Sequence, residues 1–139
     1  MKVFVFGNGN TSFDTFVKIY GKALSRALFL GKTQPVSFIV GDFRGVDTLA
    51  MEYLKTITEE VSVYHMGKSL RYFPSTFGTK AGQWKMVGGF ENDGQRDSAA
   101  INACTHFIAY DFNSSPTRKT GTQRNIERCI ELEKVWITV

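Results

Sequence analysis

The chain has few cysteines and no long apolar run. Its 139 residues contain Cys104 and Cys129, which share no C-x-x-C or Cys/His spacing. We therefore expect neither a zinc site nor a disulfide framework, and reduced, partly buried thiols would be consistent with the cytoplasm. No apolar run approaches the ~20 residues that span a bilayer. These absences predict no metal, no cofactor and no membrane contact, and residues 1–7 begin a strand rather than a signal peptide.

Concentrated positive charge and the usual hydrolase signatures are also missing. The net charge is +4, which favours anionic ligands such as nucleotides or nucleic acid, but no run of Lys and Arg marks a dedicated DNA binder. No Ser-His-Asp or Cys-His signature occurs, and His65 and His106 share no ligand spacing. Several established classes of enzyme are therefore not indicated.

Strand and helix patterns alternate along the whole chain. The apolar periodicity predicts helices near 12–30, 46–56, 93–104 and 121–132, and strands at Lys2–Phe6, Val36–Val40, Val61–His65, Thr105–Tyr110 and Val135–Val139. This order predicts one α/β domain over residues 1–139, a Rossmann-like three-layer α/β/α sandwich with a mostly parallel five-stranded sheet. Residues 66–94 break the pattern and are expected to form a long loop rich in aromatic residues, with a short helix around 80–87.

The stretch from Val36 to Ala50 has the order strand, glycine turn, helix start. Gly41 and Gly45 permit close approach of a ligand, and the first N–H groups of a helix attract an anion. Arg44 adds a cation that can bind phosphate in a bidentate manner. The alternative is an ordinary turn with a surface arginine.

Two further turns are expected at the same edge of the sheet, because ligands bind beyond the carboxyl ends of parallel strands. One follows the first strand and the other opens the last helix, whereas Arg96 belongs to the helix that starts near Asp93. The expected ligand-binding residues are Gly7, Asn8, Gly9, Gly41, Asp42, Arg44, Gly45, Asp47, Arg96, Thr120, Gly121 and Thr122. Asp42, Asp111 and Glu127 are candidates for acid–base chemistry, but the sequence places no pair of them as a catalytic dyad.

These residues resemble the SLOG superfamily, in particular its small YspA-like, YpsA-related branch. Gly41–Ala50 is similar to the G-G-A-R-G-A-D-x-L-A segment of that family, and Gln95-Arg96-Asp97 to its helix start. Thr105–Tyr110 resembles A-D-x-x-I-A-F, and Gly121-Thr122 matches the G-T that opens the last helix. The sequence departs from the P-G-G-x-G-T-x-x-E pattern of the LOG enzymes, since Asn125 stands at the position of the glutamate.

The resemblance implies a fold that binds nucleotides or nucleotide-derived ligands. Our main hypothesis is a cytoplasmic sensor or sequestering module, with phosphate on the glycine turns and aromatic residues of the 66–94 loop, such as Trp84, Tyr72 or Phe73, covering a base. One alternative is a hydrolase or transferase that acts on the N-glycosidic bond of nucleotides, the bond that the LOG relatives cleave. Another is a nucleic-acid-binding protein, by analogy with the DNA-processing relative. Relatives of this fold commonly dimerise through helices, which makes a homodimer one alternative, and the sequence leaves the oligomeric state open.

Overall fold

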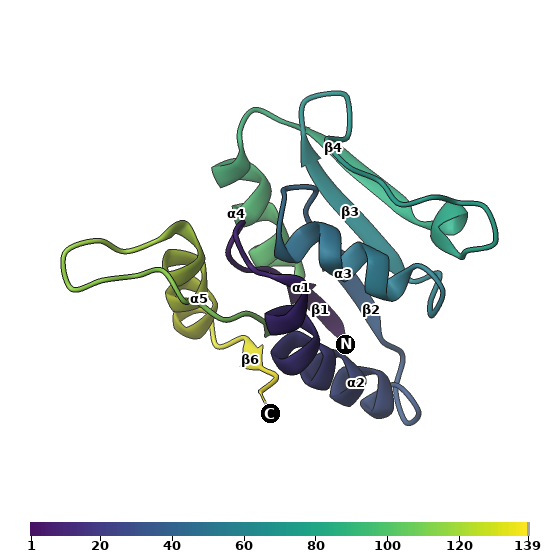
Figure 1. The fold of residues 1–139 in the computed structure, drawn as a ribbon, viewed down its shortest axis with the longest axis horizontal. Helices are drawn as coiled ribbons and strands as arrows, with labels where there is room; N and C mark the ends of the chain where they lie inside the picture. The colour runs from purple at the N-terminus through teal and green to yellow at the C-terminus, as the bar shows by residue number, and fades with distance from the viewer. Residues whose placement is uncertain (139) are drawn as a thin grey trace.

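The computed structural model describes residues 1–138 as a parallel β-sheet with helices on both faces (Figure 1). The six strands are β1 (Lys2–Val5), β2 (Ser37–Val40), β3 (Val61–Met66), β4 (Lys85–Phe90), β5 (His106–Ile108) and β6 (Val135–Trp136). Their order in the sheet is β4-β3-β2-β1-β5-β6, and every neighbouring pair is parallel. The chain thus runs outward from β1 to β4 and then returns to the other side of β1, which makes the β1/β5 boundary the switch point of the sheet.

The helices divide between the two faces of the sheet. They are α1 (Phe13–Thr15), the π-helical turn η1 (Phe16–Tyr20), α2 (Gly21–Leu30), α3 (Val46–Leu54), the 3₁₀ turn η2 (Ala81–Gln83), α4 (Asp93–Ala103) and α5 (Gly121–Glu131). The helices between β1 and β3 cover one face, whereas α4 and α5 cover the other. The predicted Rossmann-like architecture is confirmed.

Alternate residues of the central strands supply the two cores. Val3 and Val5 of β1 pack in the larger core with η1, α2 and α3, whereas Phe4 and Phe6 pack with α4 and α5. This alternation follows from the two-residue period of a strand. Both faces of β1 are therefore apolar, as expected for a central parallel strand.

The prediction of five strands was one strand short. The missing strand is β4, which lies inside the segment expected to be a loop with a short helix around residues 80–87. Its sequence KMVGGF contains two glycines, and none of its residues is fully buried, because β4 is the edge strand of the sheet. An edge strand of this composition carries no alternation of apolar and polar residues, which explains why the pattern did not reveal it.

The other elements lie where they were expected, although β5 covers only His106–Ile108 of the expected residues 105–110. Ser12 caps the first helical segment by accepting a hydrogen bond from the Thr15 N–H. The closing strand is shorter than expected, since β6 covers Val135–Trp136, and Val139 lies outside the described residues. None of the helices formed by residues 1–138 has the length and apolar character needed to cross a membrane.

Candidate functional site

A cleft of about 310 Å³ opens at the carboxyl ends of β1 and β2. Its walls come from the turns after these strands and from the starts of α3, α4 and α5. The lining residues are Phe4, Phe6, Gly7, Asn8, Gly9, Gly41, Phe43, Asp47, Asp93, Arg96, Asp97, Asn113, Thr120, Gly121, Thr122 and Asn125. The cleft lies beside the switch point of the sheet, where open α/β sheets bind their ligands. We refer to it as the main cleft.

The fold brings most of the expected ligand-binding residues into the main cleft. All three sequence segments contribute: Gly7–Gly9, the Gly41 turn with Asp47, and Thr120–Thr122, together with Arg96 from α4. Asp42, Arg44 and Gly45 do not line it. Gly45 instead shapes the turn: its φ is +80°, and a Cβ there would run into the backbone of Asn8 and Gly9.

Asn8, which is buried, joins the first turn to the loop after β5 and to the start of α5. Its side-chain amide donates to Asp111 Oδ1 at 2.9 Å and to Thr122 Oγ1 at 3.3 Å, and its Oδ1 accepts from the Phe112 N–H at 2.8 Å. Asn8 therefore acts as a connector between the first turn and the start of α5, and these bonds hold the floor of the main cleft in place.

Asp111 belongs to the same web of hydrogen bonds. Burial raises the pKa of its carboxyl, but hydrogen bonds from Ser114, Asn8 and Thr120 outweigh that effect and lower the pKa to about 2. Thr120 Oγ1 donates to it at 2.8 Å. An ionised carboxylate with this many donors holds a loop in place and has little capacity to exchange a proton near neutral pH.

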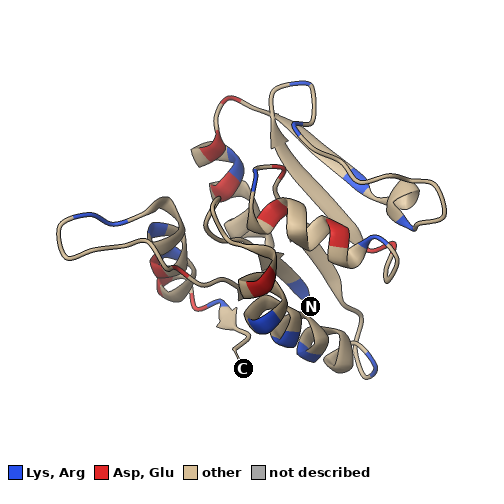
Figure 2. Ribbon diagram, in the orientation of Figure 1, with Lys and Arg blue, Asp and Glu red and all other residues tan. Residues whose placement is uncertain are grey.

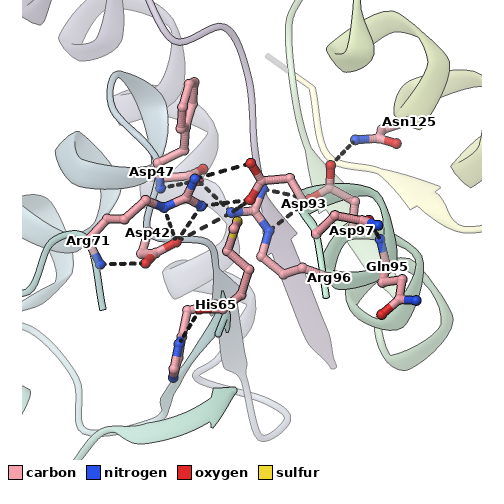
Figure 3. Close-up of polar contacts among 12 residues, drawn as sticks. Asp42, Asp47, His65, Arg71, Asp93, Gln95, Arg96, Asp97 and Asn125 are labelled. Carbon is pink, nitrogen blue, oxygen red and sulfur yellow. Dashed lines mark hydrogen bonds and ion pairs between the residues drawn. The ribbon is translucent and has the colours of Figure 1, made fainter. Parts of the chain in front are cut away.

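Arg96 lies among four aspartates at the inner wall of the main cleft (Figure 3). Only 7% of the residue is exposed. Its guanidinium nitrogens lie 2.8 Å from Asp97, 3.1 Å from Asp93, 3.5 Å from Asp42 and 4.0 Å from Asp47. The positive charge of Arg96 is thus shared among carboxylates of the protein itself.

A second arginine, Arg71, completes this network from the segment after β3. Its backbone N–H donates to Asp42 Oδ2 at 2.7 Å, and its guanidinium binds both Asp42 Oδ1 and Asp93 Oδ1 at 2.7 Å. These bonds raise the pKa of the guanidinium further above its usual range. Sequence reasoning missed Arg71 because it lies in the 66–94 segment, and no local motif indicates partners that are 29 and 22 residues away.

The carboxylates of this network outnumber its guanidiniums. Four aspartates face two arginines, and Asp47, Asp93 and Asp97 line the main cleft directly. In Figure 2, acidic segments accordingly mark the starts of α3 and α4. The inner wall of the main cleft is therefore acidic, although the whole chain is basic.

Asp47 has the most perturbed carboxyl in the main cleft. Burial raises its pKa to about 7, against the opposing effects of Arg96 and of the hydrogen bond from the Phe43 N–H. Asp47 is 6% exposed and lies in the first turn of α3. A carboxyl with this pKa is partly protonated at neutral pH and can either donate or accept a proton.

Gly41 provides the space that this arrangement needs. A Cβ at position 41 would overlap the Asp47 carboxylate and approach Arg96 Nη1 to 3.0 Å. The glycine predicted to admit a ligand thus also admits the side chains of two other cleft residues.

The three carboxylates considered for acid–base chemistry lie away from the lining of the main cleft. The side chain of Asp42 is fully buried beneath Arg71 and Arg96. Asp111 holds its loop, as described above. Glu127 pairs with Lys119 at 2.7 Å and accepts from Gln123 on the outer side of α5. Among the described carboxylates, Asp47 has the better position for proton transfer.

Asn125 stands where the family resemblance leads one to expect a glutamate. It lines the main cleft, and its side-chain amide donates to Asp97 Oδ2 at 2.9 Å, which joins α5 to α4. A glutamate in its place would put a second negative charge against Asp97. The neutral amide of Asn125 instead donates a hydrogen bond to the acidic wall without adding negative charge.

The aromatic residues expected to cover a base are placed differently. Trp84 is buried, donates its indole N–H to the Thr58 carbonyl at 2.9 Å and packs edge-on against Phe73 in the larger core. Trp84 is therefore unable to stack on a ligand in the main cleft, so the expectation was wrong for this residue, whereas Tyr72 is half-buried and lines a smaller hollow beside the main cleft. Phe43 is the aromatic side chain that reaches both the main cleft and the surface beside it.

No group of three or more His, Cys, Asp and Glu side chains within residues 1–138 is arranged to hold a metal ion. Cys104 and Cys129 are buried and form no disulfide. Comparison of the chain with protein-family models, curated proteins and solved structures found no match.

Proposed function

We propose that the main cleft binds a nucleotide or a nucleotide-derived molecule, and that the protein acts as a sensor or sequestering module for it. The observation that carries this proposal is that one wall of the cleft presents hydrogen-bond donors and another presents acceptors. The start of α5 offers N–H donors on one side, and the acidic wall offers carboxylate acceptors on the other.

The start of α5 suits a phosphate group. Thr120 caps the helix by accepting from the Gln123 N–H at 3.0 Å, and its own N–H donates to Ser114. The N–H groups of Gly121 and Thr122 donate to no other residue between 1 and 138. Unpaired N–H groups at the positive end of an 11-residue helix favour an anion.

The acidic wall suits the hydroxyl groups of a sugar. Ionised carboxylates are strong acceptors and have no hydrogen of their own to donate, so hydroxyl donors complement them. A second phosphate, by contrast, would be repelled there. This division favours a ribose beside Asp93 and Asp97, with one phosphate at Gly121.

The test removes one N–H donor from the start of α5 without removing the helix. Proline at the first position of a helix keeps its conformation, and Thr120 before it already has φ −75° and ψ 164°, which proline requires of its neighbour. Gly121→Pro should therefore weaken the binding of nucleoside monophosphates by about tenfold, the value of roughly one such hydrogen bond. The unphosphorylated nucleosides serve as the reference ligands.

Gly121→Ala is the matched control, because it keeps the N–H and its Cβ would meet Arg124 Nη2 only at an ordinary 3.7 Å. Thermal unfolding against mono-, di- and cyclic nucleotides, NAD and ADP-ribose should first identify the ligand class. A ligand at 100 times its Kd adds about 2.7 kcal/mol to the free energy of unfolding. If no nucleotide raises the Tm, the proposal is wrong.

Asp47 favours a second candidate function, the hydrolysis of an N-glycosidic bond. In such a reaction the C1′–N bond breaks, its electron pair leaves with the base, and the Asp47 proton moves to the base nitrogen. The oxygen of water joins C1′, and a water proton returns to the Asp47 carboxylate. The raised pKa of Asp47 and its place in the cleft support this role.

Release of free base from any nucleoside monophosphate, measured by chromatography, tests this candidate. Asp47→Asn should lower the rate at least 100-fold, the usual contribution of a general acid, whereas ligand affinity should change little. Undetectable release by the natural chain would leave binding alone as the function. The cytoplasm is the proposed location in either case, because the two cysteines are free and buried.

A further inference from the structure

A second hollow of about 290 Å³ lies beside the main cleft. It is lined by Asp42, Phe43, Arg44, Thr48, Arg71 and Tyr72, and we call it the Arg44 hollow. Phe43 lines both spaces, so the two are neighbours. A ligand in the main cleft thus has a second space within reach.

The two spaces differ in charge. The main cleft has an acidic inner wall, whereas the Arg44 hollow is bordered by two guanidiniums. Its one carboxylate, Asp42, is fully buried and already pairs with Arg71 at 2.7 Å and with Arg96 at 3.5 Å. The charge left over in the Arg44 hollow is therefore positive.

Arg44 supplies that charge from a defined position. Its guanidinium lies 4.8 Å from the centre of the Phe43 ring, and that of Arg71 lies 5.3 Å from the same ring. The side chain of Arg44 also lies close to Gly9, at the margin of the main cleft. Within residues 1–138, no carboxylate lies within 4.0 Å of the Arg44 guanidinium.

We propose that the Arg44 hollow is an anion subsite that takes a second phosphate group of the ligand bound in the main cleft. This inference rests on the proposed function and narrows it to nucleotides that carry two phosphate groups. Arginine binds phosphate through two parallel N–H donors, and an arginine held against a ring needs less ordering to do so. The carboxylates of the acidic wall repel phosphate, so the start of α5 and the Arg44 hollow are the two places where a phosphate group is favoured.

The first experiment uses inorganic pyrophosphate as the probe and needs no knowledge of the base. In a ¹⁵N NMR titration of the full chain, pyrophosphate should shift the Arg44 Nε–H signal and the amide signals of residues 43–48. Arg128 is the internal control, since it is exposed at the far end of α5 and pairs with Glu131. Equal shifts at Arg44 and Arg128, or no shift at Arg44, would overturn the proposal.

The second experiment measures the effect of the second phosphate by calorimetry. The ligands are the 5′-monophosphates, 5′-diphosphates and 3′,5′-bisphosphates of the four common nucleosides. We expect one class with two phosphates to bind at least tenfold more tightly than the matching monophosphate. Arg44→Ala should reduce that gain to less than twofold, Arg44→Lys should restore part of it, and Arg128→Ala should leave it unchanged.

The outcomes separate this inference from the proposed function. A tenfold gain that persists in Arg44→Ala, or equal loss of affinity for mono- and diphosphates, would overturn the second subsite while nucleotide binding stands. If pyrophosphate selectively shifts the Arg44 Nε–H signal but no nucleotide binds, the anion subsite is supported and the proposal of nucleotide binding is overturned. Unchanged Tm values would show that the exposed Arg44 side chain is dispensable for folding.

Discussion

At the scale of single residues, the candidate site depends on a few side chains that fit into spaces left by glycine. Gly41 makes room for the Asp47 carboxylate and the Arg96 guanidinium, and Gly45 adopts a positive φ where the turn contacts Asn8 and Gly9. The sequence marks both positions as glycines that bring a ligand close. Their immediate neighbours in the structure, however, are parts of the protein itself.

The effect of a methyl group should therefore depend strongly on which glycine receives it. Gly41→Ala pushes against two buried charged groups, and we expect a loss of about 1–3 kcal/mol in the free energy of unfolding. Gly21→Ala adds the same methyl group at the start of α2, where the nearest atom is 4.0 Å away, and should instead stabilise the chain by about 0.5–1 kcal/mol. Urea denaturation of both variants measures the contrast. Equal effects would contradict the packing described at Gly41.

At the scale of elements, the start of α5 combines structural and binding roles. Thr120 accepts the Gln123 N–H and donates to Asp111, so a single hydroxyl caps the helix and anchors the preceding loop. That loop projects away from the rest of the molecule in Figure 1. Its attachment at Asp111 and Thr120 therefore determines where the N–H groups of Gly121 and Thr122 lie.

Loss of the Thr120 hydroxyl should affect both stability and affinity. Thr120→Ala should lower the free energy of unfolding by about 1–2 kcal/mol, the usual cost of losing a helix cap, and should weaken the binding of phosphorylated ligands. Thr120→Ser keeps the hydroxyl and is the control. Denaturation measures the stability of the two variants, and calorimetry measures their affinity for the ligand. If the alanine variant were as stable as the serine variant, the Thr120 hydroxyl would not stabilise the start of α5.

The edge strand β4 shows how an element can form without a strong local signal. Lys85–Phe90 pairs with β3, and the preceding turn is fixed by Trp84, whose indole N–H reaches the Thr58 carbonyl. The aromatic residues that suggested a ligand-covering loop instead pack one end of this segment onto the core. Burial of a large ring is thus what holds the segment in place.

At the scale of the whole molecule, the network of two arginines and four aspartates links segments that are far apart in the chain. Arg71, after β3, joins Asp42, after β2, to Asp93 at the start of α4. Arg96 adds Asp47 and Asp97. The network therefore holds three walls of the main cleft in one arrangement.

Arg71→Met should destabilise the chain by about 2–4 kcal/mol, because it leaves the fully buried Asp42 carboxylate without its main partner. Lys55→Met breaks the exposed pair with Glu52 and should cost less than about 1 kcal/mol. Denaturant unfolding compares the two variants. If Arg71→Met cost no more than Lys55→Met, the network would contribute little to holding the walls together.

The stability of the whole chain should also depend on pH in a direction set by Asp47. The pKa of Asp47 is about 7 in the folded chain, and the ordinary value of 3.8 applies to the unfolded chain. Between pH 4 and 7 the folded state therefore binds more protons than the unfolded state. The free energy of unfolding should then fall as pH rises from about 4 to 7. Asp111, whose pKa is lowered to about 2, has the opposite effect, and its contribution is lost as pH falls below about 4.

Denaturant unfolding of the natural chain and of Asp47→Asn, from pH 4.5 to 8, measures the Asp47 contribution. The difference in free energy between the two proteins should change by about 1 kcal/mol per pH unit in favour of the variant as pH rises to about 7, and should level off above that value. A constant difference would mean that the carboxyl of Asp47 titrates normally.

Local signals determined the overall architecture. Apolar runs of strand length, the periodic apolar residues of helices and glycines after strands depend on residues that are close together in sequence. The pattern therefore predicted the parallel α/β fold and the edge of the sheet where the turns meet. The same signals placed one set of residues at a common edge of the sheet, and the structure has them in one cleft: Gly7–Gly9, Gly41, Asp47, Arg96 and Thr120–Thr122. Nucleotide binding and membership of the SLOG superfamily stay predictions.

Only the tertiary structure decided the charge of that cleft and the partners of its arginines. Asp42 and Arg96 are 54 residues apart, and Asp42 and Arg71 are 29 apart, so no local pattern indicates that these charges neutralise one another. The same is true of the raised pKa of Asp47, which arises from burial by distant segments, and of the placement of Arg44 in a second hollow. Charge pairing and burial depend on which segments the fold brings together, and the sequence pattern specifies only the segments themselves.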